Sequence, residues 1–196
     1  MSGKEILGLA AVLLTLAAYV PYFWSIFRRQ TKPHIFSWIV GGIVNITACA
    51  AQLSRGGGAG AWTAGVTGLL CIIVVVLAVP RGEKNITRGD WAAFIGALSG
   101  VLLWYFTQNP LTAVILATLT DVLGLFPTFR KSYAKPHEEA LSMWSLASLR
   151  SLLAVFALEH YSAVTVIYPA SMIFLNGAVA VMLIWRRAVL RKGKNA

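Results

Sequence analysis

The chain consists of long apolar stretches separated by short polar connections. Each stretch is about as long as a helix that crosses the hydrocarbon core of a bilayer, which needs roughly 20 residues. The pattern therefore predicts an all-α, polytopic membrane protein with seven transmembrane helices. The predicted spans are 5–27, 35–54, 61–79, 91–107, 111–129, 140–158 and 162–186.

Two segments about 103 residues apart resemble each other. The first runs from Pro21 to His34 and the second from Phe126 to His137. Each contains a proline near the end of an apolar span, then a basic turn and the tripeptide Lys-Pro-His, and a tryptophan follows at Trp38 or Trp144. Repeats of this kind are typical of transporters built from two similar halves with a site between them.

The repeat predicts two parallel three-helix bundles joined by a linker helix, a 3+1+3 arrangement. A three-helix unit reverses direction across the membrane, so one additional span is needed to make the two units parallel. The predicted units are a first bundle at 1–79, a linker at 80–110, a second bundle at 111–186 and a basic cytoplasmic tail at 187–196.

Composition and charge support a membrane location. The chain is 58% hydrophobic and 12% charged, with a mean hydropathy of +0.71, whereas a soluble domain carries about a quarter charged residues. Of its 17 Lys and Arg residues, fourteen fall on one predicted side and two on the other. The positive-inside rule then predicts an inner (plasma) membrane protein with its N-terminus outside and its C-terminus in the cytoplasm. Topology explains the net charge of +10, so nucleic acid is not an expected partner.

The predicted topology and the two basic turns resemble the PQ-loop superfamily, which includes the SWEET sugar transporters and related vitamin and amino-acid carriers. The Pro-Gln signature of that family corresponds here to Pro21-Tyr22 and Pro127-Thr128. The resemblance implies hinges at these prolines and a substrate contact at Asn176, which resembles one of a central asparagine pair. The range 67–74, where its partner would lie, contains no asparagine.

Asp121 and Arg150 are the sharpest candidates for a functional site. Each lies near the middle of a predicted span, where an ionisable side chain is costly unless it is paired or hydrated. Their similar depth predicts an Asp121–Arg150 ion pair, which would act as a gate or proton-coupling group, or as a static pair that sets helix register. The equivalent positions in the first half are near Thr15 and Asn45, so the cavity between the halves is expected to be electrostatically asymmetric.

Three polar side chains complete the predicted substrate site. Asn45, Gln52 and Asn176 are uncharged polar residues within spans, where they would either hydrogen-bond between helices or line a polar path. Asn45, Asn176 and Tyr168 are the ones predicted to contact the substrate. A proline inside a span frees a backbone carbonyl and allows bending, so we expect hinges or plain kinks at such positions. The expected hinges are Pro21, Pro127 and Pro169.

The sequence contains no recognisable catalytic motif, and we expect neither an enzyme nor a bound cofactor or metal. His34 and His137 are expected to be solvated loop residues, with a pH-sensing role as the alternative. The predicted function is transport of a small polar or amphiphilic solute by alternating access, either passive or proton-linked. The alternative is a membrane receptor or scaffold with the same fold. The expected partners are the solute and the bilayer, and a homo-oligomer is left open.

Overall fold

The structure is a computed structural model that describes residues 1–107 and 109–192, and this part of the chain is helical without strands. The predicted all-helical class is therefore confirmed for these residues. The long helices are α1 (Gly3–Phe27), α2 (Ile35–Leu53), α3 (Trp62–Arg81), α4 (Arg88–Thr107), α5 (Pro110–Ala134), α6 (Leu141–Phe156) and α7 (Ala163–Lys192). Two short 3₁₀ helices, Gly58–Ala61 and Pro136–Glu138, precede α3 and α6.

In the described part of the chain, five helices are long and apolar enough to cross a membrane, namely α1, α2, α3, α5 and α7, and α6 is a shorter apolar helix of 16 residues. Large apolar side chains such as Val76, Phe174 and Val181 are at least 65% exposed on the outside of the helices. An apolar outer surface of this kind suits lipid rather than water. The chain is therefore suited to a membrane-embedded position.

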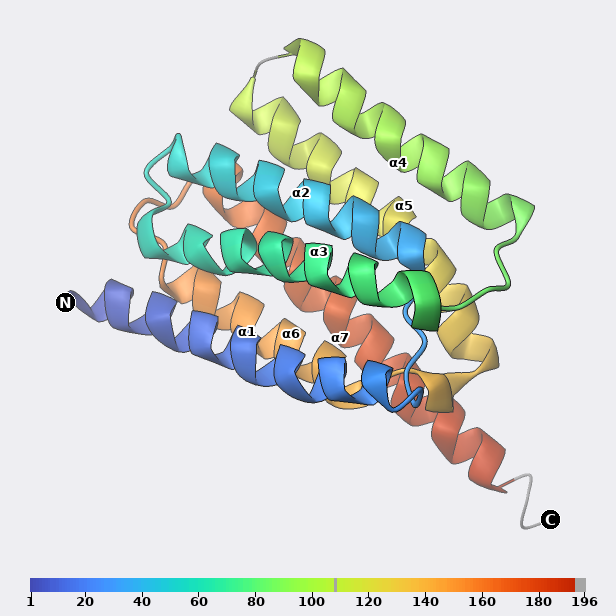
Figure 1. Ribbon diagram of the computed structural model, residues 1–196. Helices are drawn as coiled ribbons and strands as arrows, with labels where there is room; N and C mark the ends of the chain where they lie inside the picture. Colours follow the sequence, from blue (N-terminus) through green and yellow to red (C-terminus); the bar gives the residue numbers. More distant parts are fainter. Residues whose placement is uncertain (108, 193–196) are drawn as a thin grey trace.

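Six of the helices form a closed ring around the centre of the molecule. α1 packs against α3 and α6, α2 packs against α3 and α5, and α7 packs against α5 and α6. The order around the ring is thus α1, α3, α2, α5, α7, α6. α4 lies outside the ring at the edge of the molecule, against α5 and α2 (Figure 1). Exchanging α1 with α5, α2 with α6 and α3 with α7 reproduces the same set of contacts.

The C-terminal ends of α5 and α7 lie well beyond the predicted limits. The segment 130–135, expected to be a basic turn, is helical up to Ala134, because α5 continues beyond the predicted limit of 129. α7 likewise continues to Lys192, where a tail was expected from residue 187. Arg187 anchors this extension, since its guanidinium donates hydrogen bonds to the carbonyl oxygens of Pro136 and Glu139. The last part of the predicted tail, 193–196, lies outside the described residues.

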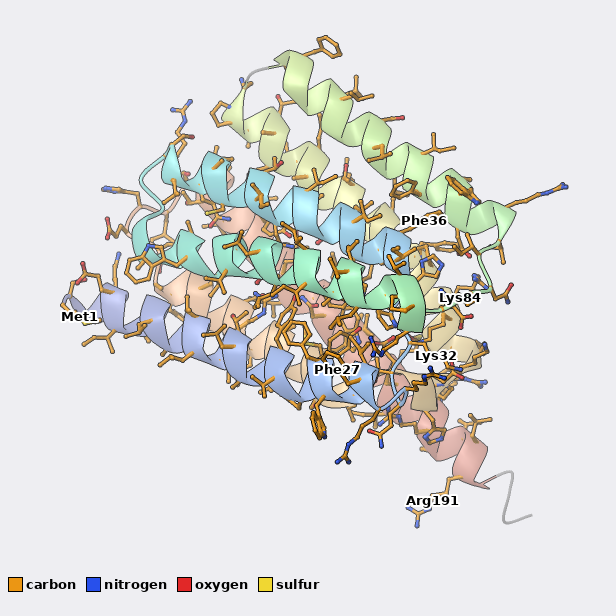
Figure 2. All side chains as sticks on the ribbon, in the orientation of Figure 1. Met1, Phe27, Lys32, Phe36, Lys84 and Arg191 are labelled. Carbon is orange, nitrogen blue, oxygen red and sulfur yellow. The ribbon has the colours of Figure 1, made fainter. Side chains whose placement is uncertain are left out.

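The two ends of the ring carry different chemistry. Met1 lies at one end, and Lys32, Lys84 and Arg191 lie at the other (Figure 2). The connections between α1 and α2, between α3 and α4 and between α5 and α6 all reach this second end, which we call the basic end (Figure 1).

Candidate functional site

A cavity of about 70 Å³ lies inside the ring, and all six ring helices contribute to its wall. The space corresponds to roughly five water molecules, at 10–15 Å³ for each. Four of the predicted site residues line it, namely Asp121, Arg150, Asn45 and Asn176. The structure therefore brings together residues that lie up to 131 positions apart in the chain.

Asp121 projects from α5 and is held by a hydroxyl group from α7. The Tyr168 hydroxyl donates a hydrogen bond to Asp121 Oδ2 at 3.2 Å. Tyr168 is only 2% exposed, so this contact is shielded. The predicted site residue Tyr168 therefore lies at the site as the partner of Asp121, although it is not part of the wall of the main cavity.

Arg150 projects from α6 and is buried, with 7% of its surface exposed. Its Nη1 donates a hydrogen bond to Thr67 Oγ1 on α3 at 2.7 Å. Its Nε has no hydrogen-bond partner among the residues that the structure describes. The guanidinium therefore keeps donor capacity in a place where unpaired donors are costly.

The predicted Asp121–Arg150 ion pair is wrong. The ion pairs found in the described part of the chain do not include it, although both side chains line the same cavity. Each group instead uses a hydroxyl of a further helix, Tyr168 for the carboxylate and Thr67 for the guanidinium. Equal depth in the membrane does not fix the direction in which each helix turns its side chain, and this direction decides whether two groups touch.

Asn45 and Asn176 face the cavity from α2 and α7. Each amide donates a hydrogen bond to the carbonyl oxygen four residues earlier, Asn45 to Gly41 at 2.8 Å and Asn176 to Met172 at 2.7 Å. A side-chain amide has two donors and an acceptor. Both asparagines therefore keep hydrogen-bonding capacity beyond these local contacts.

A second, smaller cavity continues the polar interior away from the basic end. Its volume is about 10 Å³, enough for about one water molecule. Asn45, Arg150 and Met172 belong to the walls of both cavities, and the smaller one also includes Tyr168 and Gln52. The Gln52 amide is buried at 1% exposure and neither of its polar atoms has a partner among the described residues. The unpartnered amide extends the line of polar groups along the ring axis.

The three predicted hinge prolines lie inside helices that continue through them, Pro21 in α1, Pro127 in α5 and Pro169 in α7. Pro169 lines the smaller cavity, whereas Pro21 and Pro127 are not among the described residues of either wall.

The sequence analysis missed an aromatic wall on the cavity. Tyr19, Trp38 and Trp144 line it, and the rings of Trp38 and Trp144 lie 6.5 Å apart. Both tryptophans are at most 7% exposed, so their rings pack inside the protein rather than against lipid. Their equivalent places after the two Lys-Pro-His repeats were the available signal. Tyr19, rather than Thr15, is the α1 residue that faces the cavity.

Charged contacts gather at the basic end and join the two halves. Lys131 is 3% exposed, and its ammonium donates to Glu139 Oε2 at 2.9 Å and to the carbonyl oxygens of Lys32 and Glu138. Tyr22 of α1 donates to the other oxygen of Glu139 at 3.3 Å. Lys131 therefore links α5 to the α1–α2 connection and to the start of α6.

His34 contradicts the expectation of a solvated loop residue. It is 1% exposed, and its Nε2 lies 3.5 Å from Asp90 Oδ2, while Arg130 donates two hydrogen bonds to the Asp90 carboxylate. Burial lowers the pKa of His34 from its ordinary value, and the nearby Asp90 only partly offsets this. His137, the equivalent residue of the second repeat, is exposed as expected.

Acidification should therefore destabilise the protein through His34. The pKa of His34 in the folded protein lies below its ordinary value of 6.5, so the unfolded chain binds a proton first as the pH falls. The contribution of neutral His34 to stability is fully present above about pH 6.5 and is lost as the pH falls toward the pKa of the folded protein. We expect the melting temperature of His34→Gln to depend less on pH between about 7.5 and 5.5 than that of the wild type. His137→Gln is the control, and equal pH dependence of both variants would contradict this role of His34.

Comparison of the chain with protein-family models, with curated proteins and with solved structures finds no match. No group of three or more His, Cys, Asp or Glu side chains that could hold a metal ion is found within 1–107 and 109–192. The geometry of the cavity is therefore the basis on which a function can be assigned.

Proposed function

We propose that the chain is a seven-span inner-membrane protein in which α1–α3 and α5–α7 form two parallel bundles and α4 links them. The order of the helices around the ring supports this 3+1+3 arrangement, because the same helix pairs are in contact when the two bundles are exchanged. The positive-inside rule assigns the basic end to the cytoplasm, which leaves the N-terminus outside. The PQ-loop and SWEET-like resemblance of the sequence agrees with this plan.

The proposed function is transport of a small polar or amphiphilic solute by alternating access. The observation that carries it is the cavity between the two halves, lined by all six ring helices and by ionisable groups. Ionisable side chains inside a membrane protein commonly mark substrate or ion pathways. A site at the interface of two similar halves can be opened to either side when one half rocks against the other.

The contacts at the basic end suit the closed end of such a carrier. Tyr22 and the α1–α2 connection belong to the first half, and both contact Glu138, Glu139 or Lys131 of the second. Opening toward the cytoplasm would break these contacts. Pro21, Pro127 and Pro169 are the proposed hinges for that movement.

Flux into liposomes tests this function. Purified protein in proteoliposomes is expected to accumulate or equilibrate a labelled small solute faster than empty liposomes, and Arg150→Gln is expected to abolish the difference. Binding of the solute without flux would replace the transporter by the receptor alternative.

Asp121→Asn should abolish any pH dependence of the transport rate. A carboxylate in the cavity can take up and release a proton during the cycle, whereas an amide of the same shape cannot. The initial rate measured between about pH 5.5 and 7.5 provides the readout. Glu159→Gln, which changes an exposed carboxylate at the opposite end from the basic loops, is the control. Unchanged pH dependence in Asp121→Asn would remove the coupling role.

A further inference from the structure

The cavity contains one acidic and one basic side chain that do not neutralise each other by direct contact. Asp121 and Arg150 both line it, but neither is the ion-pair partner of the other, and no further ion pair of either group is found among the described residues. A buried charge is stable only when opposite charge and hydrogen bonds compensate it. The arrangement therefore favours an occupant that carries both a positive group for Asp121 and a negative group for Arg150.

The guanidinium of Arg150 has an unused hydrogen-bond donor and a shape that suit a carboxylate. Thr67 occupies its Nη1, and its buried Nε remains without a partner in the described structure. A guanidinium presents its donors as a planar fork that matches the two oxygens of a carboxylate. Because the contact with Thr67 fixes the side chain, little conformational freedom remains to be lost on binding.

Asp121 keeps one oxygen toward the open space. Tyr168 donates to Oδ2, while a Cβ built on Gly41 would lie 4.0 Å from Oδ1 and 3.8 Å from Cys71 Sγ. The missing side chain at Gly41 therefore leaves room beside Oδ1. An ammonium group is the natural partner of a carboxylate oxygen in such a place.

The aromatic wall adds a second feature that favours a cation. Tyr19 and Trp38 lie in an edge-to-face arrangement with their ring centres 6.0 Å apart, and Trp144 continues the wall. The faces of aromatic rings, above all tryptophan, attract ammonium groups in desolvated sites. Trp38 lies one turn before Gly41 on α2, so this wall and the open side of Asp121 belong to the same region of the cavity.

We propose that the cavity binds a small zwitterion, with its carboxylate on Arg150 and its ammonium between Asp121 and the aromatic wall. A volume of about 70 Å³ restricts the ligand to a compound the size of a small amino acid. A singly charged ligand would leave one of the two protein charges without a direct contact to an opposite charge, and a neutral ligand would leave both without one. The inference rests on the proposed function only for the step in which the bound zwitterion crosses the membrane.

The test is thermal stability of the full chain in detergent with four probes of similar size: alanine, propionate, isopropylamine and 1,2-propanediol. A ligand that binds the folded state raises the apparent melting temperature. Alanine should reach half of its maximal shift in melting temperature at a concentration at least roughly tenfold lower than the other three probes. Each of those probes lacks at least one charge-assisted contact that alanine makes. An equal or larger response to the neutral diol would overturn the proposal.

Variants that remove one of the two charges should change which probe the cavity binds best. Asp121→Asn leaves Arg150 as the charged group and should bind propionate better than alanine. Arg150→Gln leaves Asp121 and should bind isopropylamine better than alanine. A purely structural role of the two side chains would lower all responses alike, and this result would overturn the assignment.

Gly41→Ala protects the test against loss of folding in the charge variants. The added methyl group makes only ordinary van der Waals contacts, so the variant should fold. It places a methyl group beside Asp121 Oδ1 and should weaken alanine binding without exchanging the charge preference. Unchanged alanine binding in Gly41→Ala would contradict the proposed position of the ammonium.

Flux measurements separate this inference from the proposed function. One outcome is that alanine binds, the variants change their ligand preference as expected, and alanine does not cross the membrane of the proteoliposomes. This outcome would support the zwitterion site and overturn transport. Transport of the neutral diol without alanine binding would support transport and overturn the zwitterion site. If a well-folded protein responds to none of the four probes, the zwitterion proposal is overturned.

Discussion

Lys131→Met should lower the free energy of unfolding by about 3–5 kcal/mol, the usual cost of leaving one partner of a buried ion pair without its counter-charge. Lys131 and Glu139 are each 3% exposed, and their charged atoms lie 2.9 Å apart. The methionine retains the volume of the side chain but leaves the Glu139 carboxylate with the hydroxyl of Tyr22 as its one remaining hydrogen-bond partner among the described residues. Two backbone carbonyl oxygens also lose their donor. Denaturation of the purified protein in detergent provides the measurement.

Lys135→Met is the matched control for this prediction. Lys135 lies one turn further along the chain and pairs with Glu83 at 3.2 Å, but its side chain is 46% exposed. Exposed pairs contribute about 0–1 kcal/mol, so its loss should be small. The double variant Lys131→Met with Glu139→Gln should recover part of the loss, because the unpaired charge is then removed. Equal losses for Lys131→Met and Lys135→Met would show that the burial of Lys131 is unimportant.

Gly124→Ala should destabilise the contact between α2 and α5 by about 1–3 kcal/mol, the range for overpacking in a dense interior. A Cβ at Gly124 would lie 2.5 Å from Val40 Cγ1 and 2.9 Å from Val40 Cβ. Valine is stiff at its first torsion, and its Cβ moves only with the backbone. The methyl group therefore has to displace α2 from α5. The same denaturation experiment measures the effect.

Gly96→Ala is the control for Gly124→Ala. A Cβ at Gly96 would lie 3.5 Å from its nearest neighbour, Leu123 Cδ1, which is an ordinary contact. Because alanine favours the helix over glycine by about 1 kcal/mol, this variant should be neutral or slightly stabilising. A neutral Gly124→Ala would mean that α2 and α5 can separate at no cost, and the ring would then be looser than its contacts indicate.

Helix positions were largely predictable because they depend on local properties of the chain. The predicted span 35–54 and the helix Ile35–Leu53 differ by one residue, since Pro33 and the glycines after Arg55 limit the apolar stretch on both sides. The end of α5 was not predictable in this way. Arg130 and Lys131 resemble a polar turn in the sequence, but tertiary contacts with Asp90 and Glu139 stabilise them in helical form.

The candidate site was predictable in its membership but not in its contacts. Asp121 and Arg150 stand out because ionisable residues are rare within apolar spans, and both do line the central cavity. Their partners, Tyr168 and Thr67, come from helices whose rotation about their own axes is decided by packing. The burial of Trp38 and Trp144 depends on the same packing, which explains why their role in the wall was missed.

The sequence alone determined that the chain is helical, that its apolar stretches suit a membrane, that its basic residues gather in alternate connections and that the Lys-Pro-His segment occurs twice. These properties follow from composition and short-range order along the chain. Only the tertiary structure decided that His34 is buried against Asp90 while His137 is exposed. It also decided that Asp121 and Arg150 face one cavity without pairing. Burial and pairing depend on which distant helices meet, and identical tripeptides therefore acquire different neighbours.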